Sequence, residues 1–329
     1  MSFTFEESLE CIIKNLDFII KMVKPKYNKI VISGGSVKGF AALGALQYVK
    51  DNGMLDEVKT YIGSSIGSII GYLLCIGYTP IECMVHVCTN RLFDNISSNL
   101  DIVSFTNGTG AINYNIIMEF LEKLTVDKIG RYITLGELKK KFEKELICSA
   151  YNFTKKQQEF FTPDTDPDMP CLTALRISSN IPLLFNRFKY MSSYYLDGGL
   201  GNNFPLNLLN KNDVTLGIYL CSGNRIEDIN AEFNLQKYIY KIIMIPISQN
   251  GNNLIKNYGH LCTDYVKIGI DAKIVDLELS NAQKLDLFSV GFRWMEDYYT
   301  NKEKNMQILE NSEPPPGGGF QEIGTQTDD

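Results

Sequence analysis

The chain is organised around one run of ten residues, Tyr61-Ile62-Gly63-Ser64-Ser65-Ile66-Gly67-Ser68-Ile69-Ile70. The run joins the end of an apolar strand to an apolar helix through a glycine-bounded turn, and its middle fits the nucleophile-elbow pattern G-x-S-x-G. Ser65 stands at the apex, while Gly63 and Gly67 leave room for a turn that is too tight for larger side chains. The N–H of Ile66 then faces whatever Ser65 attacks. The run therefore predicts an exposed nucleophilic serine where a strand meets a helix.

A second glycine-rich segment lies one strand earlier. The apolar run Lys29–Ser33 predicts a buried parallel strand, and Gly34-Gly35-Ser36-Val37-Lys38-Gly39 leads from it into a helix over 40–51. A strand, a glycine loop and a helix in this order point free backbone N–H groups at an anion. A dinucleotide fingerprint would need glycine where Ser36 stands, and the Gly-Lys-Ser/Thr of a P-loop is absent. An oxyanion hole needs only two or three such N–H groups near a nucleophile, and the next strand delivers Ser65.

The remaining pattern alternates strands with helices. Further strands are expected over 146–151, 194–196, 214–221 and 265–268, and further helices after the elbow, after Thr134, and over 171–179, 234–247 and 281–300. This alternation predicts an α/β fold in three layers, α/β/α, with a mostly parallel central sheet and the elbow between a strand and a buried helix.

The N-terminal region, 1–27, is expected to hold an amphipathic helix. Its apolar positions recur at helical spacing over 4–23, Thr4 and Glu7 match a capping box, and Pro25 ends the pattern. The apolar face is expected to pack on the rest of the chain. The alternative is an interfacial helix resting on lipid.

The domain is expected to span 28–300 and to be followed by a disordered acidic tail, 301–329. The run Pro314–Gly319 consists of three prolines and three glycines and cannot hold regular structure. Within the tail, Thr325-Gln326-Thr327 resembles the short core recognised by dynein light chain, where an extended peptide adds a strand to a sheet edge.

Composition narrows the class of protein. At 329 residues, with 44% hydrophobic and 21% charged residues, the chain reads as a soluble globular protein. A net charge of −6 without a basic stripe argues against general nucleic-acid binding. Eight cysteines without a C-x-x-C pair indicate reduced thiols in a cytosol-like compartment, and two histidines argue against a histidine-based metal site. No secretory signal is visible, and the uncharged run 61–81 is interpreted as a strand and a buried helix rather than a membrane span. A cytoplasmic protein with peripheral membrane contact fits these features.

A serine hydroxyl needs a partner that takes its proton. His86 lies among apolar residues in an expected helix, and His260 lies in an expected loop without motif support. Asp197, at the end of the run Tyr194–Gly199, is the remaining candidate, although Asp-Gly is also a common turn pair. A carboxylate with a pKa of about 4 is a weak base, so Asp197 would need a direct, partly desolvated contact with Ser65.

Three motifs resemble those of patatin-like phospholipases in order and spacing: the glycine loop 34–39, the elbow 63–67 and Asp197-Gly198-Gly199. The resemblance extends to the stretches 134–138, 176–182 and 202–205 and covers roughly residues 28–300. The resemblance is greatest to the patatin-like proteins found in large DNA viruses and bacteria.

The resemblance implies a lipid acyl hydrolase of the phospholipase A type that works through an acyl-enzyme intermediate. Ser65 is then the nucleophile and Asp197 the general base of a dyad without histidine. The implied oxyanion hole consists of backbone N–H groups of Gly34, Gly35, Ser36 and Ile66, and the supporting motif residues are Lys38, Gly39, Gly63, Gly67, Gly198 and Gly199. No metal or other cofactor is implied. The implied partner is a phospholipid or another acyl lipid at a membrane surface.

Ser36 departs from the family pattern, which usually has a glycine at this position. If the position needs a left-handed backbone, the Cβ of Ser36 resists it and the hole is distorted. If φ is negative, the N–H donates as before. The alternative to an active hydrolase is therefore a catalytically impaired lipid-binding or interaction protein.

Overall fold

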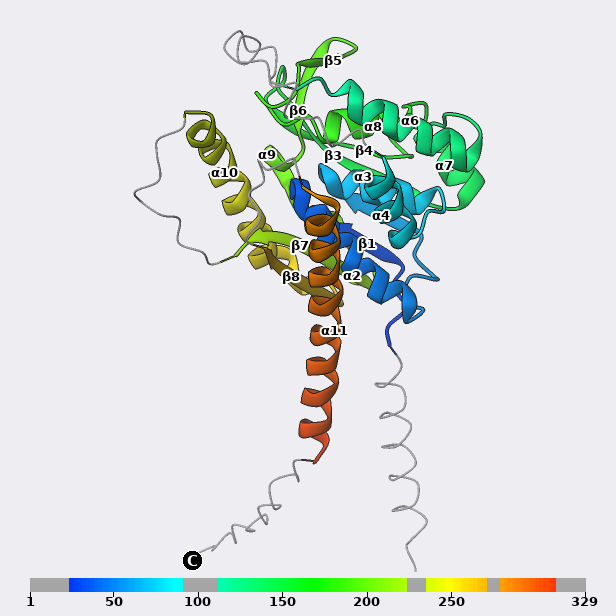
Figure 1. The fold of residues 1–329 in the computed structure, drawn as a ribbon, viewed down its shortest axis with the longest axis vertical. Helices are drawn as coiled ribbons and strands as arrows, with labels where there is room; N and C mark the ends of the chain where they lie inside the picture. The colour runs from blue at the N-terminus through cyan, green and yellow to red at the C-terminus, as the bar shows by residue number, and fades with distance from the viewer. Residues whose placement is uncertain (1–23, 91–111, 224–234, 271–278, 312–329) are drawn as a thin grey trace, which may run out of the picture.

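A computed structural model of the chain describes residues 24–90, 112–223, 235–270 and 279–311 (Figure 1). The helix expected over 4–23 and the tail motif Thr325-Gln326-Thr327 lie outside the described residues.

One mixed sheet of eight strands forms the centre of the molecule, in the order β5-β6-β3-β2-β1-β7-β8 with β4 paired to β3. The strands are β1 (Lys29–Ile32), β2 (Thr60–Gly63), β3 (Glu145–Asn152), β4 (Gln157–Phe161), β5 (Phe188–Tyr190), β6 (Ser193–Asp197), β7 (Thr215–Ser222) and β8 (Asp264–Ile270). Neighbouring strands from β3 to β8 in this order pair in parallel, and the pairs that involve β4, β5 or β6 are antiparallel. The prediction of a mostly parallel central sheet is confirmed.

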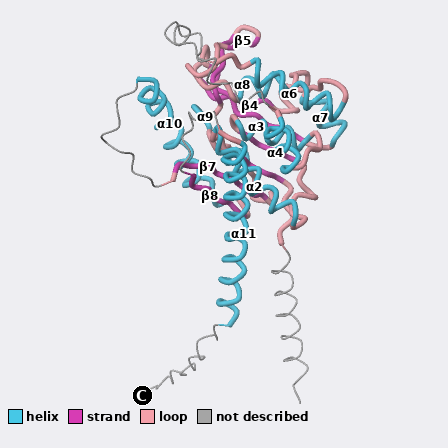
Figure 2. The backbone as a smooth tube through the Cα atoms, in the orientation of Figure 1, coloured by secondary structure: helices cyan, strands magenta, loops and turns pink. Residues whose placement is uncertain are grey.

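Helices cover both faces of this sheet (Figures 1 and 2). The α-helices are α2 (Gly39–Asp51), α3 (Ile66–Cys75), α4 (Pro80–Thr89), α6 (Asn115–Ile129), α7 (Leu135–Phe142), α8 (Cys171–Ser178), α9 (Gly199–Asn202), α10 (Leu235–Tyr258) and α11 (Asn281–Asn311), and the 3-10 helices are η1 (Ser36–Lys38), η4 (Leu206–Leu208) and η5 (Gly259–Leu261). Ile30 and Ile32 of β1 point into the larger core, which includes α2, α3 and α11. Val31 points to the other face, into a cluster with η4 and with Ile255 of α10. Successive side chains of β1 thus point to opposite faces of the sheet, and both faces are apolar, as the predicted three-layer fold requires.

The backbones of α2 and α11 touch directly where they cross. A Cβ on Gly44 would lie 1.8 Å from the carbonyl oxygen of Phe288, and a Cβ on Gly291 would lie 1.9 Å from that of Ala41. Only glycine permits this approach, so the crossing fixes α11 against the helix that follows the glycine loop.

A buried carboxylate holds α11 to the sheet. Asp264, at the start of β8, is 3% exposed and accepts hydrogen bonds from the hydroxyls of Tyr27 (2.8 Å) and Tyr298 (2.7 Å). It also pairs with Lys302. This cluster links the chain before β1, the edge strand and the last helix.

Two helices are longer than the sequence predicts. α11 continues to Asn311, which corrects the expected start of the disordered tail at residue 301. The segment 301–311 contains no glycine or proline, and Lys302 is held by Asp264, so the helix has no cause to end earlier. α10 likewise continues past Ile247 to Tyr258 even though it contains Pro246.

Strands β4 and β5 were missed. β4 is half-exposed and polar, and β5 has only three residues, so neither has the alternating apolar pattern that predicts a strand.

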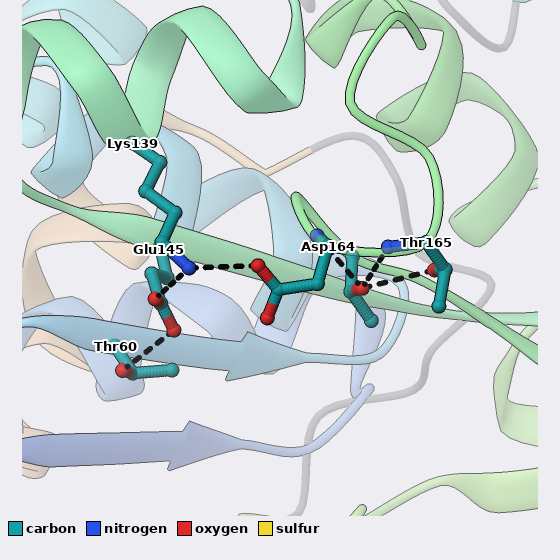
Figure 3. Close-up of polar contacts among 6 residues, drawn as sticks. Thr60, Lys139, Glu145, Asp164 and Thr165 are labelled. Atoms are coloured by element: carbon teal, nitrogen blue, oxygen red, sulfur yellow. Dashed lines mark hydrogen bonds and ion pairs between the residues drawn. The ribbon is translucent and has the colours of Figure 1, made fainter.

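An ion-pair network closes the end of the sheet where β2 and β3 begin (Figure 3). Lys139 of α7 lies 2.8 Å from both Glu145 and Asp164, and Thr60 donates to Glu145 at 3.4 Å. The elbow follows the opposite, carboxyl end of β2. This ion-pair network therefore stabilises the fold and lies at the other end of the sheet from the elbow.

Within the described residues, no single helix has both the length and the apolar content to cross a bilayer; α3 and α4 together meet these criteria but are bent by 114°.

Candidate active site

The predicted elbow forms at the end of β2. Ser65 is the residue that precedes α3, with φ 54° and ψ −124°, an unfavourable conformation that agrees with the strained turn expected of a nucleophile elbow. A Cβ on Gly63 would lie 2.3 Å from the amide nitrogen of Ser68, and one on Gly67 would lie 2.2 Å from the carbonyl oxygen of Ile32. Both glycines are therefore required by the close approach of backbone.

Ser178, the last residue of α8, forms hydrogen bonds with the elbow. Its Oγ accepts a hydrogen bond from the Ser65 N–H (3.1 Å) and lies 2.8 Å from the Oγ of Ser68. Ser178 is fully buried. The sequence offered no signal for this contact, because it joins residues more than a hundred positions apart.

The same end of α8 also positions Asp197. The N–H of Asp197 donates to the Asn180 carbonyl (2.8 Å), and the N–H of Gly198 donates to the Ser178 carbonyl (3.0 Å). The Gly199 N–H donates to the Asp197 Oδ1 at 2.8 Å. One short helix thus fixes the backbone of both dyad candidates.

Burial changes the chemistry of Asp197. The residue is 3% exposed, and desolvation raises the pKa of its carboxyl to about 6, against the opposing effects of the Ser65 hydroxyl and the Gly199 N–H. Its Oδ2 accepts no hydrogen bond from the described residues. The Oδ2 can therefore accept a proton. The raised pKa of the carboxyl suits a general base better than the ordinary pKa of an aspartate does.

Gly34, at the start of the glycine loop, lies between Ser65 of the elbow and Asn203, which follows the Asp197 motif. A Cβ there would lie 2.5 Å from the Asn203 Oδ1 and 3.2 Å from the Ser65 Cβ. The Gly34 N–H donates to the Asn203 carbonyl at 3.2 Å, so it is already engaged and does not serve as an oxyanion donor. The N–H groups of Gly35 and Ile66 have no backbone partner among the described residues.

Ser36 adopts the left-handed conformation, with φ 51°. The backbone at this position is thus the one that glycine favours, and the serine Cβ is accommodated in it. Such a residue costs about 1–2 kcal/mol relative to glycine. Two residues later, the buried Lys38 donates to the Ser222 Oγ at 3.0 Å and ties the loop to the end of β7.

A cavity of about 230 Å³ opens over these groups. Gly35, Ser36, Ser65 and Asp197 line it together with residues of β7, β8 and α10, which are Tyr219, Leu220, Cys221, Lys267, Met244 and Ile247. The sequence does not predict that β7, β8 and α10 line the cavity, because their lining residues belong to no motif and come after the three matched motifs in the chain.

Neither histidine lines the cavity. The ring of His86, on α4, packs edge-on against Tyr78 with centroids 5.3 Å apart, and His260 lies in η5. The described residues also contain no group of three or more His, Cys, Asp or Glu side chains that could hold a metal ion. The seven cysteines among them are free thiols.

Comparisons with known proteins identify the family. Residues 30–210, more than half of the chain, match the family model of patatin-like phospholipases. The chain is 40% identical over 192 residues to the probable lipid hydrolase 463L of Invertebrate iridescent virus 6, an alignment that covers 56% of this chain and 64% of that protein. It is 30% identical over 288 residues to the uncharacterized protein YqhO of Bacillus subtilis, covering 80% of this chain and 94% of that protein. The crystal structure of VipD from Legionella pneumophila shares the fold, with a TM-score of 0.50, 16% identity and coverage of 88% of this chain and 67% of that chain. The chain belongs to the patatin-like phospholipase family.

Proposed function

We propose that this protein is a lipid acyl hydrolase of the phospholipase A type, in which Ser65 and Asp197 form the catalytic dyad. The observation that carries the proposal is that the buried Asp197, whose Oδ2 has no hydrogen-bond partner among the described residues, lines the same cavity as the strained Ser65. Family membership and the likeness to a viral protein named as a lipid hydrolase support an acyl lipid as substrate.

In the proposed reaction, the Ser65 Oγ attacks the ester carbonyl while the Asp197 Oδ2 accepts the hydroxyl proton. The N–H groups of Gly35, Ser36 and Ile66 stabilise the oxyanion, each donor contributing about 3 kcal/mol. Asp197 then gives the proton to the leaving alcohol oxygen. A water molecule then attacks the acyl carbonyl while Asp197 accepts its proton. Asp197 gives this proton to the Ser65 Oγ as the acyl–oxygen bond breaks, which releases a fatty acid and restores both residues.

The alternative is a lipid-binding protein whose turnover is impaired by Ser36. The φ of 51° at Ser36 is the left-handed case, in which the Cβ is expected to resist the conformation and distort the hole. We favour the active enzyme because the serine nevertheless adopts the backbone that glycine favours, so that the cost falls on stability. On this view Ser36→Gly changes turnover by less than about threefold, whereas impairment predicts a rise of orders of magnitude.

The direct test measures fatty-acid release from phospholipid vesicles. Ser65→Ala is expected to abolish release, and labelling by a fluorophosphonate probe, while leaving the circular dichroism spectrum unchanged. Unchanged release by this variant would overturn the proposal. A wild-type protein that neither labels nor releases fatty acid, and gains both on Ser36→Gly, would favour the alternative.

A further inference from the structure

The helix that walls the cavity also carries exposed apolar side chains. On α10, Met244 and Ile247 line the cavity, whereas Tyr238, Ile242 and Ile245 are 53%, 49% and 55% exposed. Their spacing of four and three residues places these three on one helix face. We call Tyr238, Ile242 and Ile245 the α10 stripe.

The stripe lies on the projecting half of its helix. The C-terminal half of α10 is held to the domain, because the Asn250 side chain donates to the Gly201 carbonyl at 2.8 Å and Gly251 packs against the ring of Tyr219. The N-terminal half reaches away from the sheet (Figure 1). The stripe therefore lies on the projecting half of a helix that also contributes residues to the cavity.

Within α10 itself, the charged residues have one sign. The 24 residues of α10 contain Lys237, Lys241 and Lys256 and no acidic residue, in a chain whose net charge is −6. Lys267 of β8, which is exposed, lines the same cavity. An exposed apolar helix face combined with lysines is the pattern that binds the interface of an anionic bilayer.

We propose that α10 docks this protein on an anionic lipid bilayer, with the stripe among the acyl chains and the lysines near the lipid phosphates. This inference rests on the proposed function, since an acyl lipid must pass from the bilayer into the cavity. Docking through α10 brings the cavity to the membrane surface and shortens that passage.

The test is vesicle co-sedimentation of the full chain carrying Ser65→Ala, so that binding is measured without hydrolysis. The variant Tyr238→Ser/Ile242→Ser/Ile245→Ser removes the stripe. Ile81→Ser/Val85→Ser on α4 is the matched control, because these two apolar residues are also 42% and 52% exposed and four positions apart.

Removal of the stripe is expected to weaken binding to phosphatidylglycerol vesicles by about tenfold or more. The α4 control is expected to bind as the parent does, and added salt or pure phosphatidylcholine vesicles are expected to reduce binding. In the Ser65 background, loss of the stripe should lower hydrolysis of vesicle lipid and leave hydrolysis of soluble p-nitrophenyl butyrate unchanged.

Vesicle binding that survives removal of the stripe would overturn the inference. So would a stripe that serves only to join two copies of the chain, seen as a halved mass in light scattering with vesicle binding unchanged. Failure of the proposed function is distinguishable, because stripe-dependent sedimentation of a protein that cleaves no ester would leave the docking intact.

Discussion

At the scale of the residue, the burial of Asp197 is what makes its carboxyl a better base for the proposed reaction. Its pKa of about 6 results from the loss of solvent around the carboxylate. The base must be unprotonated to act, so kcat/KM is expected to rise with pH and level off above a midpoint of about 6. A pH–rate profile on a soluble ester measures this midpoint. A profile that is flat between pH 5 and 8 would contradict the assignment of Asp197 as the base.

The same burial costs stability at neutral pH. The pKa of Asp197 is 3.8 in its ordinary state and about 6 when folded, so the folded chain binds the proton more tightly and stability falls as pH rises between these values. Asp197→Asn removes the charge and is expected to raise the free energy of unfolding by about 1–3 kcal/mol at pH 7. The gain should shrink as pH falls and disappear by about pH 3, where the wild-type carboxyl is mostly protonated in both states. Urea titrations at the two pH values measure the difference, and an equal gain at both would argue against a charge effect.

Ser36 carries a measurable strain. Replacement by glycine is expected to raise the free energy of unfolding by about 1 kcal/mol, because it relieves the left-handed conformation, while the freer unfolded chain offsets part of the gain. Ser36→Ala is the matched control, since it keeps the Cβ and the strain and should give no such gain. Thermal unfolding of the three proteins compares them, and a gain for alanine as large as that for glycine would point to the hydroxyl instead.

At the scale of elements, the C-terminal end of α8 holds the backbones of Ser65 and Asp197, the proposed nucleophile and base. Ser178→Ala leaves the Ser65 N–H without its acceptor and is expected to cost about 1–3 kcal/mol of stability. It should also lower kcat about tenfold at unchanged KM, because the elbow is less well positioned.

Ser64→Ala provides the control for this experiment. The Ser64 Oγ is buried and has no hydrogen-bond partner among the described residues, so its removal is expected to leave stability unchanged or slightly higher. If both alanine variants behaved alike, the hydrogen bond of Ser178 would not be the cause.

The sequence predicts best those elements in which a short stretch of chain by itself determines which residue types fit. The glycines of the elbow are needed because backbone approaches them within a few ångströms, and the apolar strands β1, β2 and β7 are buried on both faces. What escaped prediction depends on contacts across the fold. The engagement of the Gly34 N–H by Asn203 and the wall formed by α10 both join distant segments, and neither leaves a pattern in a single stretch of chain.

At the scale of the whole molecule, Asp264 joins the first described segment, the edge strand and the last helix. Asp264→Asn removes the charge that Lys302 and two tyrosine hydroxyls share, and it is expected to lower the free energy of unfolding by about 2–4 kcal/mol. Asp297→Asn on the exposed face of α11 is the control and should have no effect beyond about 0.5 kcal/mol. Urea denaturation measures both. A small effect at Asp264 would mean that the crossing of α2 and α11 alone holds the last helix.

The raised pKa of Asp197 also gives the proposed enzyme a form of self-limitation. Each ester that it cleaves yields a fatty acid, which ionises near neutral pH and releases a proton. In a small, weakly buffered compartment these protons accumulate, and a base with a pKa of about 6 becomes protonated within the range they reach. The burial of one carboxylate would thus slow lipid breakdown as its own products build up, without a separate regulatory site.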